Sequence, residues 1–160
     1  MKLTQDRVRE LFEYHDGQLI RKITAGSFGV KGTIAGTMRP DGKITVGIDG
    51  RMVLIHRVIF LWHHGHMPTY IDHKDLNKLN NRIGNLRPAT KAENGRNRSK
   101  QRNNTSGHKG VTWDKSRSKW TAAIVVNQKR IYLGRFEDLN IAAKAYAEAA
   151  VRYHGEFARS

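Results

Sequence analysis

The chain has 160 residues, which is enough for one ordinary domain or two small ones. Hydrophobic residues make up 38% of it, so any core is limited, and the absence of cysteine excludes disulfides and a four-cysteine structural zinc site. A net charge of +15 indicates a polyanionic partner, because lysine and arginine side chains release condensed counterions when they bind the phosphates of DNA or RNA.

The first half of the chain has the pattern of a β-meander between two helices. Thr4 is a suitable N-cap for a short helix that carries Val8 and Leu11. Asp-Gly pairs at residues 16–17, 41–42 and 49–50 then mark two-residue hairpin turns. The strands that we expect beside these turns are residues 11–15, 18–22, 33–38, 43–48 and 51–55. Residues 56–64 have apolar side chains at helical spacing before Gly65, which predicts a second helix.

Three histidines, His63, His64 and His66, stand at the end of that second helix. They could bind a metal ion, but no nearby cysteine or carboxylate completes a tetrahedral set of ligands. The alternative is that they are solvated or face DNA.

Residues 70–97, YIDHKDLNKLNNRIGNLRPATKAENGRN, place a carboxylate, an imidazole and two carboxamides among arginines. The first four are Asp72, His73, Asn85 and Asn94, and the arginines, candidate phosphate contacts, are Arg82, Arg87, Arg96 and, just after the segment, Arg98. A hard divalent cation prefers oxygen ligands and keeps several waters when one or two protein groups hold it, so Asp72 and Asn94 are candidate metal ligands. The His73 imidazole can take a proton from water at neutral pH, and Asn85 can orient the loop or His73.

The local structure of this segment is harder to predict. On an extended strand Asp72 and His73 would project to opposite faces, so we expect a turn or bulge to intervene. Residues 82–86 could form one helical turn, and residues 90–97 a short helix that starts with a Thr-x-x-Glu capping box. The alternative is that Asp72-His73 is an ordinary turn pair, that Asn80, Asn81 and Asn85 cap helices, and that Asn94 ends one. Each residue alone favours that alternative, whereas the combination at this spacing favours a site.

The order DH, then NLR twelve residues on, then AEN, with HRV at residues 56–58 before them, closely resembles the HNH endonucleases over roughly residues 55–97. The resemblance is strongest to homing endonucleases of the phage-intron kind, which have asparagine as the last metal ligand. It implies a two-stranded ribbon and a helix around one metal ion, with Mg²⁺ expected and Mn²⁺ as the alternative. It also implies that His73 is the general base, that Asp72 and Asn94 are the metal ligands, and that Asn85 braces the loop. His56 stands where the family has its His-Arg pair, which implies a supporting role.

Residues 98–107, RSKQRNNTSG, are polar, basic and almost free of apolar side chains, which indicates a linker. From Lys91 to Lys119 the chain has nine lysines and arginines against two acidic residues, a local surplus of seven. Arg98, Lys100 and Arg102 could therefore lie along a DNA groove. A solvated basic surface is the alternative.

From His108 onward, KGVTWD, SKWTAAIVV and KRIYLGRF alternate apolar and polar residues and predict three strands. An alanine-rich amphipathic helix over residues 140–154 follows, and Gly155 ends it. The segment resembles the APETALA-type DNA-binding domain of plant ethylene-response factors. The matching residues are Lys109-Gly110-Val111, Trp113, Lys119-Trp120, Ala122, Ile124, Leu133-Gly134, Phe136, Ala142-Ala143, Ala145-Tyr146 and Gly155.

This second resemblance implies that the sheet lies in the major groove of DNA. The candidate contacts are Lys109, Trp113, Arg117, Lys119, Trp120, Arg130 and Tyr132. Arginine can bind guanine bidentately and tryptophan can pack against sugar or a thymine methyl, whereas lysines mostly meet phosphate. Core packing is the alternative for each tryptophan. The chain lacks the arginine of the family's usual GVR start, since Thr112 follows Val111, so its base preference can differ.

The sequence therefore predicts an α+β protein: a β-rich region with a ββα-metal HNH core at residues 1–97, a basic linker at 98–107 and a three-stranded antiparallel sheet packed on one α-helix at 108–160. The predicted function is a metal-dependent, site-specific DNA endonuclease of the homing type that nicks double-stranded DNA. We expect a cytoplasmic monomer, in the host cytoplasm if phage-encoded, with no membrane or obligate protein partner. The main alternative is a non-catalytic sequence-specific DNA-binding regulator. An RNA-binding protein is disfavoured because no aromatic cluster of the RNA-reading kind is present.

Overall fold

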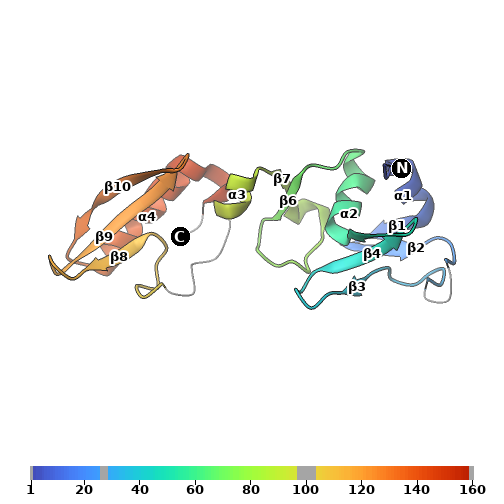
Figure 1. Ribbon diagram of the computed structural model, residues 1–160, viewed down its shortest axis with the longest axis horizontal. Coiled ribbons are helices and arrows are strands. Elements are labelled where there is room, and N and C mark those ends of the chain that lie inside the picture. The colour runs from blue at the N-terminus through green and yellow to red at the C-terminus, as the bar shows by residue number, and fades with distance from the viewer. Residues whose placement is uncertain (1, 26–28, 97–103, 159–160) are drawn as a thin grey trace. The chain divides into compact units, whose positions relative to one another are not determined.

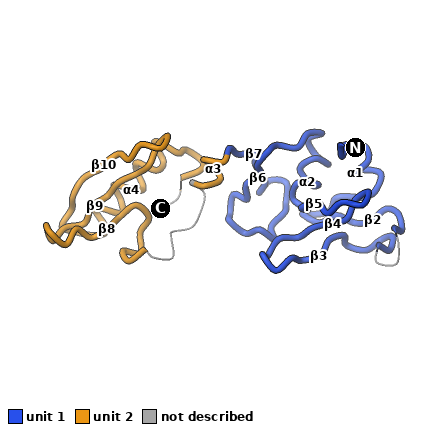
Figure 2. The backbone as a smooth tube through the Cα atoms, in the orientation of Figure 1, with its two compact units in different colours: residues 1–90 blue, residues 91–160 orange. Residues whose placement is uncertain are grey.

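The computed structural model describes residues 2–25, 29–96 and 104–158, which form two compact units (Figures 1 and 2). The first unit is residues 1–90 and the second is residues 91–160, whereas the sequence placed the end of the first module at residue 97. Most of the predicted linker, including Arg98, Lys100 and Arg102, lies outside the described residues. Within the described part of the chain, no helix has the length and apolar character needed to cross a membrane.

The first unit begins with a helix and a hairpin. α1 (Gln5–Leu11) is capped by Thr4, whose hydroxyl accepts a hydrogen bond from the backbone N–H of Arg7 at 3.3 Å. The chain then enters β1 (Phe12–His15), which pairs antiparallel with β2 (Gln18–Arg21). The turn between them has positive φ at Asp16 and Gly17, 44° and 88°, a conformation that an Asp-Gly pair adopts readily. The predicted helix cap and hairpin are thus confirmed.

Three further strands form a second small antiparallel sheet in the order β3-β4-β5. They are β3 (Thr37–Met38), β4 (Ile44–Ile48) and β5 (Arg51–Leu54). The predicted meander is therefore present, but its first strand is shorter than residues 33–38. Ile34 instead forms an isolated bridge with Ile20 of the hairpin.

The core of the first unit is built around α2 (Ile55–His64), which contacts α1, β4 and β5. Val58 and Ile59 are fully buried at 0% exposure, because the apolar face that the sequence predicted for this helix points into the core. The helix ends at Gly65, whose φ of 71° is the left-handed conformation that glycine adopts without strain.

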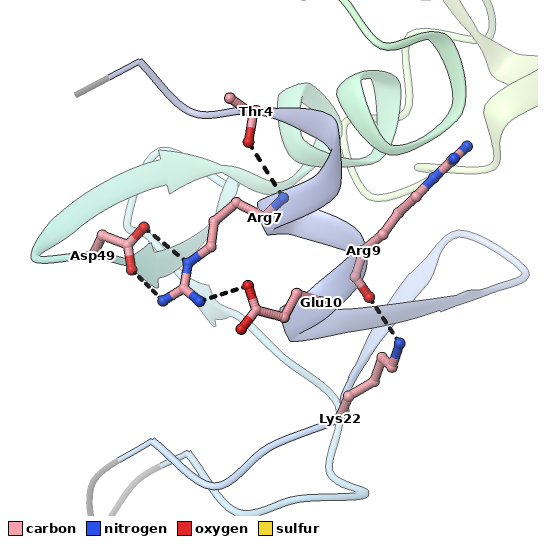
Figure 3. Close-up of polar contacts among 6 residues, drawn as sticks. All are labelled: Thr4, Arg7, Arg9, Glu10, Lys22 and Asp49. Carbon is pink, nitrogen blue, oxygen red and sulfur yellow. Dashed lines mark hydrogen bonds and ion pairs between the residues drawn. The ribbon is translucent and has the colours of Figure 1, made fainter.

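Polar contacts fix α1 to the turn between β4 and β5 (Figure 3). Arg7 donates to both carboxylate oxygens of Asp49, from Nε at 3.2 Å and from Nη2 at 2.7 Å, and to Glu10 from Nη1 at 2.9 Å. Lys22 Nζ donates to the carbonyl of Arg9 at 2.9 Å. The hydrogen bonds from Arg7 lower the pKa of Asp49. These groups are exposed, so they orient the helix more than they stabilise the fold.

The second unit is a three-stranded antiparallel sheet covered by one long helix. Its strands, in the order β10-β9-β8, are β8 (Val111–Asp114), β9 (Lys119–Val126) and β10 (Lys129–Phe136). The helix α4 (Leu139–His154) packs across them, with Ala142 and Tyr146 buried against Val111 and Ile124. Two short helices, α3 (Lys91–Arg96) and η2 (Gly155–Phe157), contact each other in the same unit. The three strands and the alanine-rich helix are as predicted.

Close packing of α4 on the sheet depends on Gly110, just before β8. Gly110 has a φ of 70°, and a Cβ at this position would meet the ring of Tyr146 and lie 2.6 Å from the carbonyl oxygen of Ala123. Only glycine fits both the backbone conformation and the space.

The described end of the predicted linker, residues 104–107, is tied to this unit. The buried hydroxyl of Ser106 lies 2.8 Å from the carbonyl oxygen of Val111 and accepts a hydrogen bond from the backbone N–H of His108. Asn104 Nδ2 donates to the carbonyl of His108 at 2.8 Å. These residues therefore form part of the second unit, while residues 98–103 stay a predicted linker.

Candidate active site

The residues singled out by the sequence lie on and around a two-stranded ribbon of the first unit. β6 (Tyr70–His73) pairs antiparallel with β7 (Leu86–Ala89), and the short helix η1 (Ile83–Asn85) leads into the second strand (Figure 1). Ile71 and Leu86 are buried in the core that contains α2, so the ribbon is anchored by its apolar positions. The polar side chains next to them in the ribbon, those of Asp72, His73 and Arg87, are therefore carried by a strand pair that is packed on the core.

The pairing of the ribbon runs through Asp72 and His73 without a register shift, so the bulge expected between them is not present. Asp72 pairs with Arg87 across the ribbon, and His73 pairs with Leu86. On a regular strand, successive side chains point in opposite directions, so the side chains of Asp72 and His73 have different surroundings.

Asp72 is buried at 5% exposure, and Arg87, opposite it, at 7%. Arg87 donates to Oδ2 of Asp72 from Nε at 3.0 Å and from Nη2 at 2.9 Å. Both groups lose water on burial, and this cost is offset only because the charges are opposite and the hydrogen bonds are well formed. Arg87, which the sequence suggested as a phosphate contact, is therefore buried in the structure, and its guanidinium fixes the orientation of the Asp72 carboxylate.

The side chain of His73 contacts Asn81 and His56. Its Nε2 lies 3.0 Å from Oδ1 of Asn81, a side chain that is 2% exposed. Its ring also meets the ring of His56 edge-on, with centroids 5.2 Å apart and planes at 72°. Burial, together with repulsion from His73, Arg57 and Lys43, lowers the pKa of His56 to about 4, so His56 is neutral at neutral pH.

The side chain of Asn85 makes three hydrogen bonds within the loop between β6 and β7. Its Nδ2 donates to Asp75 Oδ1 at 2.9 Å and to the carbonyl of Asn80 at 2.8 Å, while its Oδ1 accepts from the backbone N–H of Asp75 at 3.1 Å. Burial acts to raise the pKa of Asp75, but hydrogen bonds from Asn80, Asn85 and the backbone of Asn77 lower it overall. The loop between β6 and β7 is thus fastened to the strand end that carries His73.

The other predicted residues of this segment have varied surroundings. Arg82 is exposed and makes a two-point contact with Asp16, with Nε and Nη2 both at 2.6 Å from carboxylate oxygens. Asn94 is on α3, within the second compact unit, and the side chain of Arg96 lies outside the described residues. The predicted helix at residues 90–97 corresponds to α3.

The metal ligands predicted from the sequence are oxygen donors, the type that a hard cation prefers. The described residues include no cluster of three or more His, Cys, Asp or Glu that could form a complete metal cage. Mg²⁺ does not need one, because it is commonly bound by one or two carboxylates, with waters and substrate phosphates completing the octahedron. A carboxylate at Asp72 and a carboxamide at Asn94 are ligands of the type that such a site uses.

The histidines at the end of α2 lie against aromatic rings. His63 contacts Tyr14 and Trp62, with centroids 4.4 Å and 4.7 Å away, and His64 contacts Phe60 at 4.3 Å. Burial is the largest cause that lowers the pKa of His63. These contacts favour packing over metal binding.

The sheet of the second unit has one face under α4 and one face away from it. Ala122 and Ile124 of β9 are in the core, so alternation places the side chains of Ala123 and Val125 on the other face. Their cross-strand partners are Tyr132 and Arg130. Tyr132 is 55% exposed and Val125 is 57% exposed, so this face combines apolar and cationic side chains.

The remaining predicted contacts of the second unit have different surroundings. Arg117 and Lys119 are ion-paired, with Asp114 at 3.2 Å and Glu137 at 3.4 Å respectively. Trp120 is partly buried and packs against the core, so for Trp120 the alternative of core packing fits better. Trp113 meets Trp120 edge-on at 4.9 Å but is 42% exposed. Lys109 lines a hollow of this unit together with Tyr146.

Comparison with known proteins identifies a family for the part of the chain that contains this ribbon. Residues 53–96 match the family described as HNH endonuclease, and the match contains Asp72, His73, Asn85 and Asn94. The chain therefore carries an HNH endonuclease domain.

Two viral relatives extend this result. The chain is 38% identical over 90 residues to "Protein 3.8" of Escherichia phage T7, which is 56% of this chain and 74% of that protein. It is 38% identical over 116 residues to "Uncharacterized HNH endonuclease L560" of Acanthamoeba polyphaga mimivirus, which is 71% of this chain and 59%, less than two thirds, of that protein. No solved structure is significantly similar. The chain belongs to the same family as the phage T7 protein, and the domain match and the mimivirus relative support a nuclease.

The sequence reasoning missed two residues that contact His73. Asn81 was noted only as a residue that could cap a helix, and His56 only through the family resemblance. A signal for Asn81 was present in the adjacent pair of asparagines, but their spacing from His73 does not reveal which of the two turns inward. The contact between His56 and His73 joins residues far apart in the chain, and it follows only from the packing of α2 against the ribbon.

Proposed function

We propose that the protein is a metal-dependent, site-specific DNA endonuclease of the homing type that nicks one strand, with His73 as the general base. The observation that carries this proposal is the fixed His73 imidazole, which follows Asp72 of the buried Asp72–Arg87 pair on a ribbon inside the HNH endonuclease match. An imidazole held by hydrogen bonding and ring packing is suited to proton transfer, because general-base catalysis requires the base in a defined geometry.

In this proposal His73 takes a proton from the attacking water while the water oxygen bonds to phosphorus and the bond to the leaving oxygen breaks. Asp72 and Asn94 are assigned as ligands of a divalent ion, Mg²⁺ in the first place. Such an ion, when bound, stabilises the charge that develops on the phosphate and the leaving oxygen. Arg87 keeps the Asp72 carboxylate in place, Asn85 holds the loop behind His73, and the exposed Arg82 is a candidate phosphate contact.

The second unit is proposed to supply the preference for a DNA site. The support is the face of its sheet away from α4, where the exposed Arg130 and Tyr132 lie beside Val125. Arg135 stacks over Tyr132 at 5.8 Å from the ring centroid, so it joins this face although the sequence reasoning did not include it. Arginine beside an aromatic and an apolar side chain can read base edges, whereas lysine contacts mostly position the protein on phosphates.

One observation favours a second candidate, a DNA-binding regulator without catalytic activity. The Asp72 carboxylate is engaged by Arg87, as it would be in a scaffold that only maintains the ribbon. A regulator of this kind would bind duplex DNA and leave it intact at every metal concentration.

A plasmid-nicking assay separates the two candidates. The purified full chain is incubated with supercoiled DNA and Mg²⁺, Mn²⁺ or a chelator, beside the variants His73→Ala and His15→Ala. His15 is the matched control, because it is an exposed histidine of the same unit on β1. We expect metal-dependent nicking by the parent and by His15→Ala, and a rate on the order of 10² to 10⁴ times lower for His73→Ala with DNA affinity retained. Full activity of His73→Ala would refute the assignment of the base, and binding without nicking by the parent would identify the regulator.

A further inference from the structure

The orientation of the Asn81 carboxamide determines which nitrogen of His73 carries a proton. Nδ2 of Asn81 lies 3.3 Å from the carbonyl oxygen of Leu79, which can only accept a hydrogen bond. Oδ1 of Asn81 is therefore the atom that faces Nε2 of His73, at 3.0 Å. Since this oxygen can only accept, Nε2 must donate, and the lone pair of the neutral imidazole is on Nδ1.

His56 restricts the same ring from another direction. It lies on α2 next to the buried Ile55, and its ring meets that of His73 edge-on at 5.2 Å. The lowered pKa of His56, caused first by burial, keeps this neighbour uncharged near neutral pH. A neutral ring in edge-on contact limits rotation of the His73 ring without placing a second positive charge beside it.

We propose that Asn81 and His56 are positioning residues for His73, Asn81 by selecting the tautomer with the proton on Nε2 and His56 by restricting the ring. The inference rests on the proposed function, because it makes Nδ1 the nitrogen that accepts the proton from water. Without the Asn81 acceptor, a neutral imidazole populates both tautomers and both ring orientations, and only a part of these states is productive.

The tautomer can be tested without cleavage. In a long-range ¹H–¹⁵N spectrum of the full chain, the His73 signals are identified by their loss in His73→Ala. We expect a single tautomer with Nε2 protonated, and in Asn81→Leu a mixture of tautomers with faster exchange of the Nε2 proton. The control is Asn80→Leu. It removes a neighbouring carboxamide that donates a hydrogen bond to Asp75 and not to His73, so this variant should keep the parent's tautomer. A parent spectrum with Nδ1 protonated, or a spectrum that Asn81→Leu leaves unchanged, would overturn the inference.

Cleavage tests the consequence. Under single turnover, we expect Asn81→Leu and His56→Ala to lower the rate constant roughly tenfold to hundredfold with DNA affinity unchanged, as is typical when a reacting group is misplaced. Asn81→Asp, which keeps an acceptor, and His56→Phe, which keeps a ring, should each recover much of the loss. Equal rates for parent, Asn81→Leu and His56→Ala would overturn the positioning roles. If the parent cleaves nothing, the proposed function fails, while the spectrum still decides the tautomer.

Discussion

The partly buried imidazole of His56 makes a specific prediction about acid stability. Its pKa is about 4 in the folded chain, against an ordinary value of 6.5. Between these two pH values the unfolded chain binds a proton at His56 that the folded chain does not bind. The contribution of His56 to the free energy of unfolding is therefore fully present above pH 6.5 and is lost as the pH falls toward 4. One pKa unit corresponds to about 1.4 kcal/mol. The whole shift therefore corresponds to a loss of roughly 3 kcal/mol in the free energy of unfolding, and lowering the pH to about 5 corresponds to a loss of roughly 2 kcal/mol.

The assay is urea unfolding of the full chain at several pH values, followed through the methyl resonances of Val58 and Ile59. Both are fully buried in the first unit, so they report on that unit alone. His56→Phe removes the titrating group and keeps a ring, so its stability should depend much less on pH, with His63 responsible for a remaining slope because its pKa is also lowered. Titration of His56 near its ordinary pKa, or the same pH dependence in parent and variant, would refute the reasoning.

Three further outcomes are expected. Asp72→Ala should lower the free energy of unfolding by about 3 to 5 kcal/mol, because the buried guanidinium of Arg87 loses its carboxylate partner; the double variant Asp72→Leu, Arg87→Leu should regain most of this stability in a urea titration yet nick no plasmid. Gly110→Ala should destabilise the second unit by roughly 2 to 4 kcal/mol, measured by thermal unfolding beside Gly107→Ala, where φ is also positive but no atom lies within 4 Å of the added Cβ. Fragments 1–90 and 91–160 should each give the circular dichroism of a folded unit, and fragment 1–90 should not cleave, because it lacks Asn94; unfolded fragments would contradict the division.

Elements with a local signal could be predicted from the sequence. The Asp16-Gly17 turn, the Thr4 cap and the helix before Gly65 follow from residues that are neighbours in the chain, and each is present in the structure. The three strands and the alanine-rich helix of the second unit follow from alternation and helical spacing in the same way. The sequence predicts an α+β protein for the same reason, and the structure has both helices and several small sheets, whereas the arrangement of ribbon, helix and metal stays a proposal.

Features that depend on long-range pairing could not be predicted. Arg87 has the sequence character of an exposed cation, and its burial follows only from the register that places it opposite Asp72. Trp120 could read DNA or pack, and the choice depends on the face of β9 to which it belongs. The bulge at Asp72-His73 was expected because both side chains were assumed to lie on the same face of the strand. The structure shows instead that Asn81 and His56 reach His73 from other elements.

The Asp72–Arg87 pair also bears on function, because its contribution to stability does not explain its presence. A buried ion pair can often be replaced by well-packed apolar residues of similar volume with no loss of stability, since the cost of desolvating two charges can exceed their attraction. A fold that needed only a stable ribbon could therefore have two leucines at these positions. In the proposed function, the carboxylate at position 72 is an oxygen ligand for a hard cation, and the hydrogen bonds from Arg87 offset the cost of burying it. For this reason the double leucine variant is the informative one, since it should keep the fold and lose the chemistry, whereas a regulator would bind DNA equally well with either pair.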